Sequence, residues 1–447
     1  MTENHGVKLA IRNGRVVDPA TGVDAPRDLL IAAGRIVGIV APGEGGDFKA
    51  ARTFDATGLV VCPGLIDLSA RLREPGSEYR ATLESEIEAA LAGGVTSLVC
   101  PPDTDPPLDE PGLVEMLKHR ARTLNRTQVH PLGALTMGLA GSALTEMSEL
   151  YDAGCVGFSQ ANVPIADTQV LLRALQYAQT FGFTVWWRPQ DAYLGRGGVA
   201  ASGPVSARLG LPSVPVTNET VALLTLFELL RSFGVEQGVS AAPRVHLCRL
   251  SSAGGVALVR AARAEGLPVS CDVGVHHVHL TDIDIGFFDA QCRIDPPLRS
   301  QRDKAAIRSA LADGTIDAVC SDHTPVDDDG KLLPFGEAES GASGLELLLP
   351  LVLKWADEDG VPMADALARV THRAAAIIGG AVASIPTGRI EVGGIADLCL
   401  FDPDERWTVS PATLKSQGRN TPFIGYEMKG RVRATVVGGA IVHEVRT

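Results

Sequence analysis

The middle of the chain alternates short apolar runs with longer amphipathic stretches, and this alternation constrains the fold more than any other feature. The apolar runs have the length of β-strands and fall at residues 60–67, 95–100, 128–135, 155–159, 183–187, 244–248, 268–272 and 317–321. Between most of them apolar residues recur at helical spacing, as in residues 82–92, 168–179 and 253–264. Strands that alternate with helices form parallel sheets, so eight such units predict an α/β fold, a (β/α)8 TIM barrel.

The two ends of the chain have a different pattern. Residues 7–60 alternate apolar and polar side chains in short segments, separated by the turn dipeptides Asn13-Gly14 and Ala33-Gly34. Such dipeptides between alternating runs are typical of hairpins. The pattern returns in residues 388–402 and 432–442. We therefore predict a small β-sandwich domain assembled from residues 1–60 and 380–447, with the barrel domain at residues 61–379.

Charge and hydropathy narrow the classes of partner. The net charge is −13 and no basic run occurs, which disfavours nucleic acid or an anionic membrane as a partner. The first residues resemble no secretory leader, and no window reaches the roughly 18 apolar residues of a spanning helix. We expect a cytoplasmic protein.

Its eight cysteines form no Cys-x-x-Cys pair, so we expect reduced, mostly buried thiols.

The stretch at residues 60–76 carries the strongest motif. It contains Pro-Gly-Leu-Ile-Asp, ending at Asp67, and Leu-Arg-Glu-Pro-Gly, ending at Gly76. This resembles the first barrel strand of bacterial-type dihydroorotases of the amidohydrolase superfamily, where Asp-x-His-x-His lies between the same flanks and both histidines hold a catalytic zinc ion. Ser69 and Arg71 occupy those two positions here. The resemblance covers nearly the whole chain and also implies a barrel with a terminal sandwich.

The same resemblance assigns the other metal-ligand positions. Gln160 stands where the family has an aspartate after the fourth strand, and Arg188 and Arg249 stand in place of histidines after the fifth and sixth strands. Asp322, after the eighth strand, matches the family residue that serves as metal ligand and proton carrier. We interpret Asp322 as a vestigial catalytic residue.

These replacements oppose metal binding. Catalytic zinc normally has three protein ligands, and only one carboxylate remains. Three guanidinium groups, at Arg71, Arg188 and Arg249, would point to the place where the cations sit in the family. At about 5 Å and an effective dielectric constant of about 20, one such charge repels a dication by roughly 6–7 kcal/mol. We therefore predict that zinc is absent and that the chain holds no cofactor.

The residues that would contact substrate are only partly kept. Arg73 matches the family arginine that binds the substrate carboxylate. Asp103 and Asp295 replace asparagines, the second in an Asp-Pro-Pro-Leu-Arg segment that ends at Arg299, and Val326 replaces a histidine. Arg73, Asp103, Asp295 and Arg299 would form a substrate-like pocket. An added carboxylate in it would repel an anionic substrate.

Two interpretations of the three arginines remain open. They pair with Asp322, Asp103 or Asp295 and fill the former metal cavity with ion pairs, because a buried charge must be paired. Alternatively, they form a pocket for a carboxylate or phosphate ligand.

A relocated metal site is a further alternative. It would use His246, His277 or His323. His277 lies in the run from His276 to His279, which we expect on a strand, where neighbouring side chains face opposite sides. Two loops are expected beside the barrel mouth, at residues 195–218 and 326–331.

The resemblance suggests a function. Some bacteria carry a degenerate dihydroorotase that assembles with aspartate transcarbamoylase, the preceding enzyme of pyrimidine biosynthesis. We expect a non-catalytic, structural subunit that binds the catalytic chain of that enzyme in a homo- or hetero-oligomer. An active cyclic-amide hydrolase with an atypical or metal-free site is one alternative, since Asp322 and Arg73 are kept. A sensor that binds an anion in the arginine pocket is another.

Overall fold

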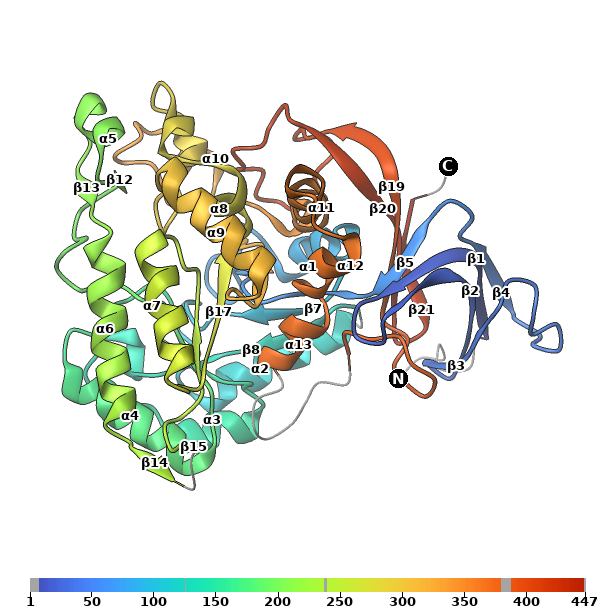
Figure 1. Cartoon of the computed structure of the whole chain (residues 1–447), viewed down its shortest axis with the longest axis horizontal. Helices are drawn as coiled ribbons and strands as arrows, with labels where there is room; N and C mark the ends of the chain where they lie inside the picture. Colours follow the sequence, from blue (N-terminus) through green and yellow to red (C-terminus); the bar gives the residue numbers. More distant parts are fainter. Residues whose placement is uncertain (1–7, 125, 237–238, 379–386, 446–447) are drawn as a thin grey trace.

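The structure is a computed structural model of the chain and describes residues 8–124, 126–236, 239–378 and 387–445. It has two parts (Figure 1). A helix-surrounded barrel forms the larger part, and a twisted, mostly antiparallel sheet with strands from both terminal regions forms the other. The predicted TIM barrel with a terminal β-sandwich is confirmed.

The terminal sheet takes its strands from both ends of the chain. Its strand order is β21-β20-β19-β5-β1-β2-β3, and β4 pairs with β1. The strands are β1 (Leu9–Asp18), β2 (Val23–Ala32), β3 (Arg35–Val40), β4 (Arg52–Asp55), β5 (Val60–Pro63), β19 (Leu398–Thr408), β20 (Glu427–Val437) and β21 (Ala440–Glu444). Inward-facing aliphatic side chains of these strands form an apolar core separate from that of the barrel.

The two predicted turn dipeptides have different structures. Ala33-Gly34 is the two-residue turn between β2 and β3, and both residues have positive φ, as a type I′ turn requires. Asn13-Gly14 is not a turn. The strand β1 continues through it with a bulge, where Asn13 has φ of 63° and the register with β2 shifts by one residue.

The barrel contains eight parallel strand positions. They are β6 (Leu65–Asp67), β7 (Val95–Cys100), β8 (Gln128–Pro131) with β9 (Gly133–Ala134), β10 (Phe158–Ser159), β11 (Val185–Trp187), β16 (Val245–Leu247), β17 (Val269–Gly274) and β18 (Ala318–Cys320). The third strand is split, so that β8 pairs with β7 while β9 pairs with β10. The barrel closes where the His323 N–H donates to the Ser69 carbonyl oxygen at 3.1 Å.

The run at residues 60–67 serves both parts of the protein. The sequence analysis takes it as one barrel strand, but β5 pairs with β1 and β19 of the terminal sheet, and only β6 belongs to the barrel. Gly64 lies between them. The position requires a glycine, because a Cβ there would lie 2.2 Å from the Thr96 hydroxyl oxygen. The division into two domains at residues 60 and 380 stays a proposal, and the second boundary lies outside the described residues.

Helices surround the barrel (Figure 1). They are α1 (Leu83–Ala92), α2 (Pro111–Leu124), α3 (Met147–Ala153), α4 (Thr168–Phe181), α6 (Thr217–Arg231), α7 (Ala253–Ala264), α9 (Gln301–Asp313), α11 (Leu348–Asp359), α12 (Met363–Ala368) and α13 (His372–Ile378). Side-chain caps mark the starts of α1, α4, α7 and α9, as where the Ser252 hydroxyl accepts from the Gly255 N–H at the beginning of α7.

Two segments at the barrel mouth contain more secondary structure than the sequence analysis expects. The loop at residues 195–218 includes β12 (Ala200–Ala201), α5 (Pro204–Leu209) and β13 (Ser213–Val214). Pro204 starts α5 because its fixed φ suits the first helical turn. Residues 328–332 form α10 (Asp328–Leu332), whose aspartates favour a helix N-terminus.

The histidine run is also helical. It forms α8 (Val275–His279), since β17 ends at Gly274, so the expected alternation of strand faces is wrong there.

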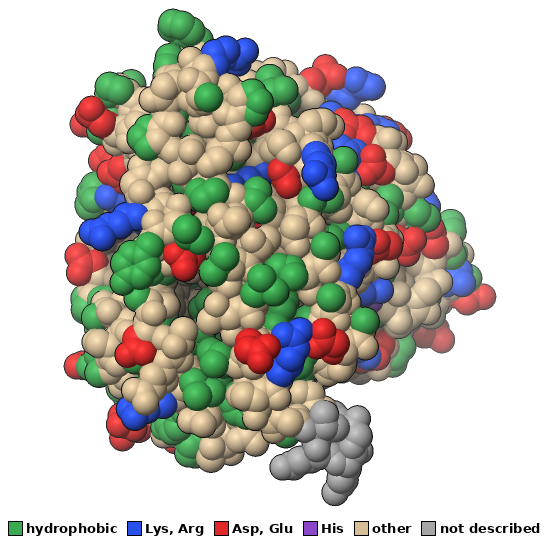
Figure 2. Space-filling view, turned by 60° about the vertical axis from the view of Figure 1, so that its left-hand side comes forward, with side chains coloured by type: hydrophobic (Ala, Val, Ile, Leu, Met, Phe, Trp, Pro, Cys, Tyr) green, Lys and Arg blue, Asp and Glu red, His purple; other side chains and the backbone are tan. Residues whose placement is uncertain are grey.

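All eight cysteines are unpaired and seven are buried. Among the helices of the described residues, none is long and apolar enough to cross a membrane. The face in Figure 2 carries acidic and basic side chains intermingled, with scattered hydrophobic ones.

Candidate functional site

Three arginines meet at the mouth of the barrel, where the carboxyl ends of the strands lie. Arg71 follows β6, Arg188 follows β11 and Arg249 follows β16. Each is at most 7% exposed. Active sites of TIM barrels form at this end, so these arginines occupy the place where the fold builds catalytic sites.

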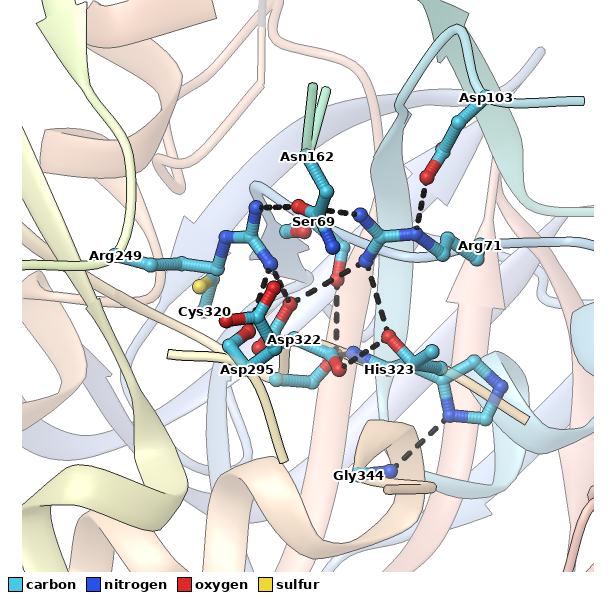
Figure 3. A network of polar contacts seen from close by, with 12 residues as sticks. Ser69, Arg71, Asp103, Asn162, Arg249, Asp295, Cys320, Asp322, His323 and Gly344 are labelled. Carbon is cyan, nitrogen blue, oxygen red and sulfur yellow. Dashed lines mark hydrogen bonds and ion pairs between the residues drawn. The ribbon is translucent and has the colours of Figure 1, made fainter. Parts of the chain in front are cut away.

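Asp322 joins two of these arginines. Its Oδ1 accepts a hydrogen bond from Arg249 Nη1 at 3.0 Å and lies 3.5 Å from Arg71 Nη1 (Figure 3). Arg71 also donates from Nε to Asp103 at 2.7 Å and from Nη1 to the Thr324 hydroxyl at 3.0 Å. The single retained carboxylate of the ligand set is thus held by guanidinium groups.

The backbone at both residues of this pair is unusual. Asp322 has φ of 46° and Arg249 has φ of 57°. Non-glycine residues adopt this left-handed region at a cost of order 1–3 kcal/mol, and such residues cluster at functional sites. The backbone at the Arg249–Asp322 contact therefore has a conformation that is common at functional sites.

Asn162 links the same two arginines and was missed by the sequence analysis. Its side-chain oxygen accepts hydrogen bonds from Nη2 of Arg71, at 3.2 Å, and from Nη2 of Arg249 (Figure 3). The signal was available, because Asn162 is a polar residue directly after the fourth strand, two positions beyond Gln160.

Arg188 forms a two-pronged ion pair with Asp295. Its two terminal nitrogens donate to the two carboxylate oxygens. Arg249 adds a hydrogen bond to the Asp295 carbonyl oxygen at 3.3 Å. Burial opposes ionisation of Asp295, but the charge of Arg188 outweighs it and lowers the carboxyl pKa to about 2. Asp295 is therefore a carboxylate at neutral pH.

The charges of the cluster balance. Asp103 and Asp295 have lowered pKa values, since their arginine partners outweigh the effect of burial. For Asp322, burial raises the pKa, while the charges of Arg249 and Arg71 act against this rise. Three guanidinium groups therefore face three carboxyl groups, as the ion-pair interpretation expects.

Ser69 and Gln160 contribute little to the cluster. Gln160 points away from it and donates to the Leu139 carbonyl oxygen at 2.8 Å and to the Thr136 hydroxyl at 2.9 Å. Ser69 lines a cavity of about 20 Å³ together with the three arginines. A volume of this size holds about one water molecule.

The remaining pocket residues, Arg73 and Arg299, contact different segments of the chain. Arg73 donates from Nε to the Pro325 carbonyl oxygen at 2.8 Å, and burial together with Arg71 lowers its pKa to about 10. Arg299 donates to Ser251 at 3.2 Å and to the Val214 carbonyl oxygen at 2.8 Å, and the charges of Arg188 and Asp295 act on it. Its contact with Val214 supports the segment at residues 195–218, and its place in the substrate-like pocket stays a prediction.

His246 and His323, which were considered for a relocated metal site, form hydrogen bonds with other side chains and with the backbone. His246 contacts Ser270 at 2.9 Å and Asp272 at 3.0 Å. His323 accepts from the Gly344 N–H at 3.1 Å through Nδ1, so its Nε2 donates to Glu86. Within the described part of the chain, no three His, Cys, Asp or Glu side chains come together in a group that could hold a metal ion.

The zinc centre that the amidohydrolase fold implies does not fit these residues. Zinc requires several His, Cys or carboxylate ligands around one point. At that point the chain has guanidinium nitrogens, which remain protonated and cannot ligate a cation. The carboxylate of Asp322 is already bound by two of them.

Comparisons with known proteins identify the family of the chain. A family model described as dihydro-orotase-like matches residues 58–242, and one described as amidohydrolase family matches residues 224–443. A dihydroorotase-like protein of Pseudomonas aeruginosa is 43% identical over 98% of this chain and 99% of its own length. A dihydroorotase of Geobacter sp. is 37% identical over 98% of this chain and its full length.

Solved structures show the same fold. The L-hydantoinase (dihydropyrimidinase) of Arthrobacter aurescens superimposes with a TM-score of 0.85 at 24% identity, covering 98% of this chain and 96% of that one. A D-hydantoinase superimposes with a TM-score of 0.79 at 21% identity. The family indicated by the first barrel strand is confirmed, and the chain belongs to the dihydroorotase-like proteins of the amidohydrolase superfamily.

Proposed function

We propose that this protein is a dihydroorotase-like subunit without hydrolase activity, which binds the catalytic chain of aspartate transcarbamoylase and supports it structurally. The observation that carries the first half of the proposal is the contact of Asp322 with both Arg249 and Arg71. It places two cations where a hydrolase of this superfamily would need metal ions.

The surroundings of Asp322 support the proposed loss of activity. A metal-free hydrolase would need a general base within hydrogen-bond reach of a water and with lone pairs available for it. Asp322 is 7% exposed, and its Oδ1 is shared by two guanidinium groups. Because both guanidinium groups contact Oδ1, we propose that Asp322 is retained in a structural role.

The partner follows from the family resemblance. Degenerate dihydroorotases that lack the zinc ligands assemble with aspartate transcarbamoylase in some bacteria, and the replacements at Ser69, Arg71, Arg188 and Arg249 resemble theirs. An oligomer of the two chains is therefore the proposed working form.

Two measurements on the purified protein test the loss of activity. Metal analysis is expected to give far less than one zinc ion per chain, also after incubation with zinc. Hydrolysis of dihydroorotate is expected to stay at the background of an Asp322→Asn variant, with or without zinc. Stoichiometric zinc, or turnover that Asp322→Asn abolishes, would contradict the proposal.

A third measurement tests the partner. Co-expression of this chain with the aspartate transcarbamoylase catalytic chain of the same organism is expected to give a complex that co-elutes on size exclusion. Transcarbamoylase activity should depend on this chain. A catalytic chain that elutes alone and is fully active would remove the structural role.

An active hydrolase remains the second candidate, favoured by Arg73, which donates from Nε to the Pro325 carbonyl oxygen and is only partly buried. The dihydroorotate assay decides between the two. The anion sensor has less support, because the arginine cluster is balanced by aspartates and the cavity beside it has about 20 Å³.

A further inference from the structure

A second and much larger cavity lies at the opposite end of the barrel. Its volume is about 600 Å³. It is lined by residues at the starts of β8 and β10, by the exposed side of α2, by the β2–β3 turn and by β20 and β21. The cavity therefore lies where the terminal sheet meets the amino-terminal face of the barrel.

The lining of this cavity is cationic. Four of its residues carry a positive charge, Arg35, Lys118, Arg122 and Arg126, and none of the described residues that line it is an aspartate or glutamate. This composition is unusual for a chain with a net charge of −13. A site of one sign of charge attracts ligands of the other sign.

Arg35, Lys118 and Arg122 have no carboxylate partner among the described residues. Lys118 and Arg122 are one helical turn apart on α2, so they face the same side. Lys118 donates to the Gly154 carbonyl oxygen at 3.2 Å, and burial together with Arg122 lowers its pKa. Arg35 donates to the Gly393 carbonyl oxygen at 2.7 Å, whereas Arg126 pairs with Glu88.

The wall also contains an unsatisfied polar atom. Nε2 of His130 is buried and has no hydrogen-bond partner in the described part of the chain. Burial and Lys118 lower the pKa of His130 to about 4, so the ring is neutral at physiological pH. The surrounding wall is apolar, with Val129, Val156 and Val442. A buried polar atom normally has a partner, and because this one has almost no accessible surface, the imidazole ring must turn before a ligand can reach it.

We propose that this cavity binds a phosphate ester of about the size of a mononucleotide. Lys118 and Arg122 would bind the phosphate, as paired cations do. The ring portion would lie against the valines, and a turn of the imidazole would bring His130 Nε2 to it as a hydrogen-bond partner. The volume lies within the range of about 300–1,000 Å³ that is usual for small-molecule sites, which often form between domains. The site is independent of the arginine cluster and of the proposed partner.

Calorimetric titration of the full chain tests the proposal. The probes are adenosine 5′-monophosphate, ribose 5-phosphate and adenosine. The nucleotide is expected to bind with micromolar affinity that falls as salt is added, ribose 5-phosphate more weakly, and adenosine at least tenfold more weakly than the nucleotide. Absence of binding by both phosphate esters, or equal binding of adenosine and the nucleotide, would overturn the site.

Variants locate the binding. Arg122→Glu is expected to weaken nucleotide binding at least tenfold and to leave the fold intact, because Arg122 is exposed. The matched control is Arg173→Glu at an exposed position of α4 outside the cavity, with an expected change below twofold. His130→Phe should weaken the nucleotide more than ribose 5-phosphate. Equal effects of Arg122→Glu and Arg173→Glu, or no effect of His130→Phe on the nucleotide, would contradict the assigned contacts.

Discussion

Arg188 binds both carboxylate oxygens of Asp295, and in doing so it ties the end of β11 to the segment that follows α8. The guanidinium is buried, whereas the carboxylate is a third exposed. Two-pronged contacts of this kind fix geometry as well as charge. The pair therefore holds two strand-end segments together at the mouth of the barrel.

Removal of one partner should be costly. We expect Asp295→Ala to lower the free energy of unfolding by about 2–3 kcal/mol, because it leaves the buried Arg188 unpaired; the partial exposure of the site reduces the larger cost of a fully buried pair. Urea denaturation measures the change. The double variant Arg188→Met with Asp295→Leu should recover most of the loss, since it removes both charges. Additive losses would show that the two residues do not interact.

The pair of Arg188 and Asp295 should make the stability of the protein depend on pH. The carboxyl pKa of Asp295 falls to about 2 in the folded state, from an ordinary value of about 3.9. A lowered pKa contributes stability that is complete above the unfolded value and is lost as the pH falls toward the folded value. The stability difference between the unaltered chain and Asp295→Asn should be constant above about pH 5 and shrink by about 1–2 kcal/mol by pH 2. Thermal unfolding at several pH values measures it, and a difference that grows in acid would contradict this assignment.

Much of the fold could be predicted from the sequence because the barrel depends on local patterns. The run at residues 95–100 and the helical spacing at residues 253–264 match β7 and α7 residue by residue. The errors arise where two parts of the protein share a segment or where turn chemistry is ambiguous. Val60–Pro63 is as apolar as a barrel strand, and only its pairing with β1 and β19 assigns it to the terminal sheet.

The sequence also predicts only part of the candidate site. The convergence of Arg71, Arg188 and Arg249 could be predicted, because strand ends of a barrel meet at one face. Their partners could not be assigned, since spacing along the chain does not say which carboxylate each guanidinium reaches. Asn162 was missed because an asparagine after a strand usually forms a turn. Its bridging role depends on two arginines that are distant in sequence.

The buried contact between Glu86 and His323 should stabilise the barrel strongly. Glu86 also accepts hydrogen bonds from the Ser416 hydroxyl at 2.7 Å and from the Gln417 N–H at 3.1 Å, so it joins α1, the end of β18 and the carboxyl-terminal segment. We expect Glu86→Gln to lower the free energy of unfolding by about 2–4 kcal/mol, because an amide cannot accept all these bonds.

The matched control for that variant lies on the same helix. Glu84 is exposed in the first turn of α1, and Glu84→Gln should change the stability by at most about 0.5 kcal/mol. Chemical denaturation of both variants gives the comparison. Equal effects would show that the buried contact does not determine the stability of this region.

Lys331 should give the chain a stability that rises with pH. Its ammonium is buried and donates only to carbonyl oxygens, those of Ala290 at 3.1 Å and Arg293 at 3.0 Å. Burial, with a contribution from Arg293, lowers the Lys331 pKa to about 7, from an ordinary value of about 10.4. Between these values the unfolded chain binds a proton that the folded chain does not. Unfolding is therefore disfavoured as the pH rises, by up to about 1.4 kcal/mol per pH unit.

Lys331→Met should remove this dependence. From pH 7.0 to 8.5 the unaltered chain is expected to gain about 1–2 kcal/mol relative to Lys331→Met, measured by urea denaturation at each pH. This range stays at or below the ordinary pKa of the cysteine thiols, whose ionisation in the unfolded chain would act in the opposite direction. Lys415→Met, at an exposed position, is the control and should follow the unaltered chain. If the curves of the unaltered chain and Lys331→Met stay parallel, Lys331 remains charged in the folded state and its two carbonyl contacts are enough to hold an ammonium ion there.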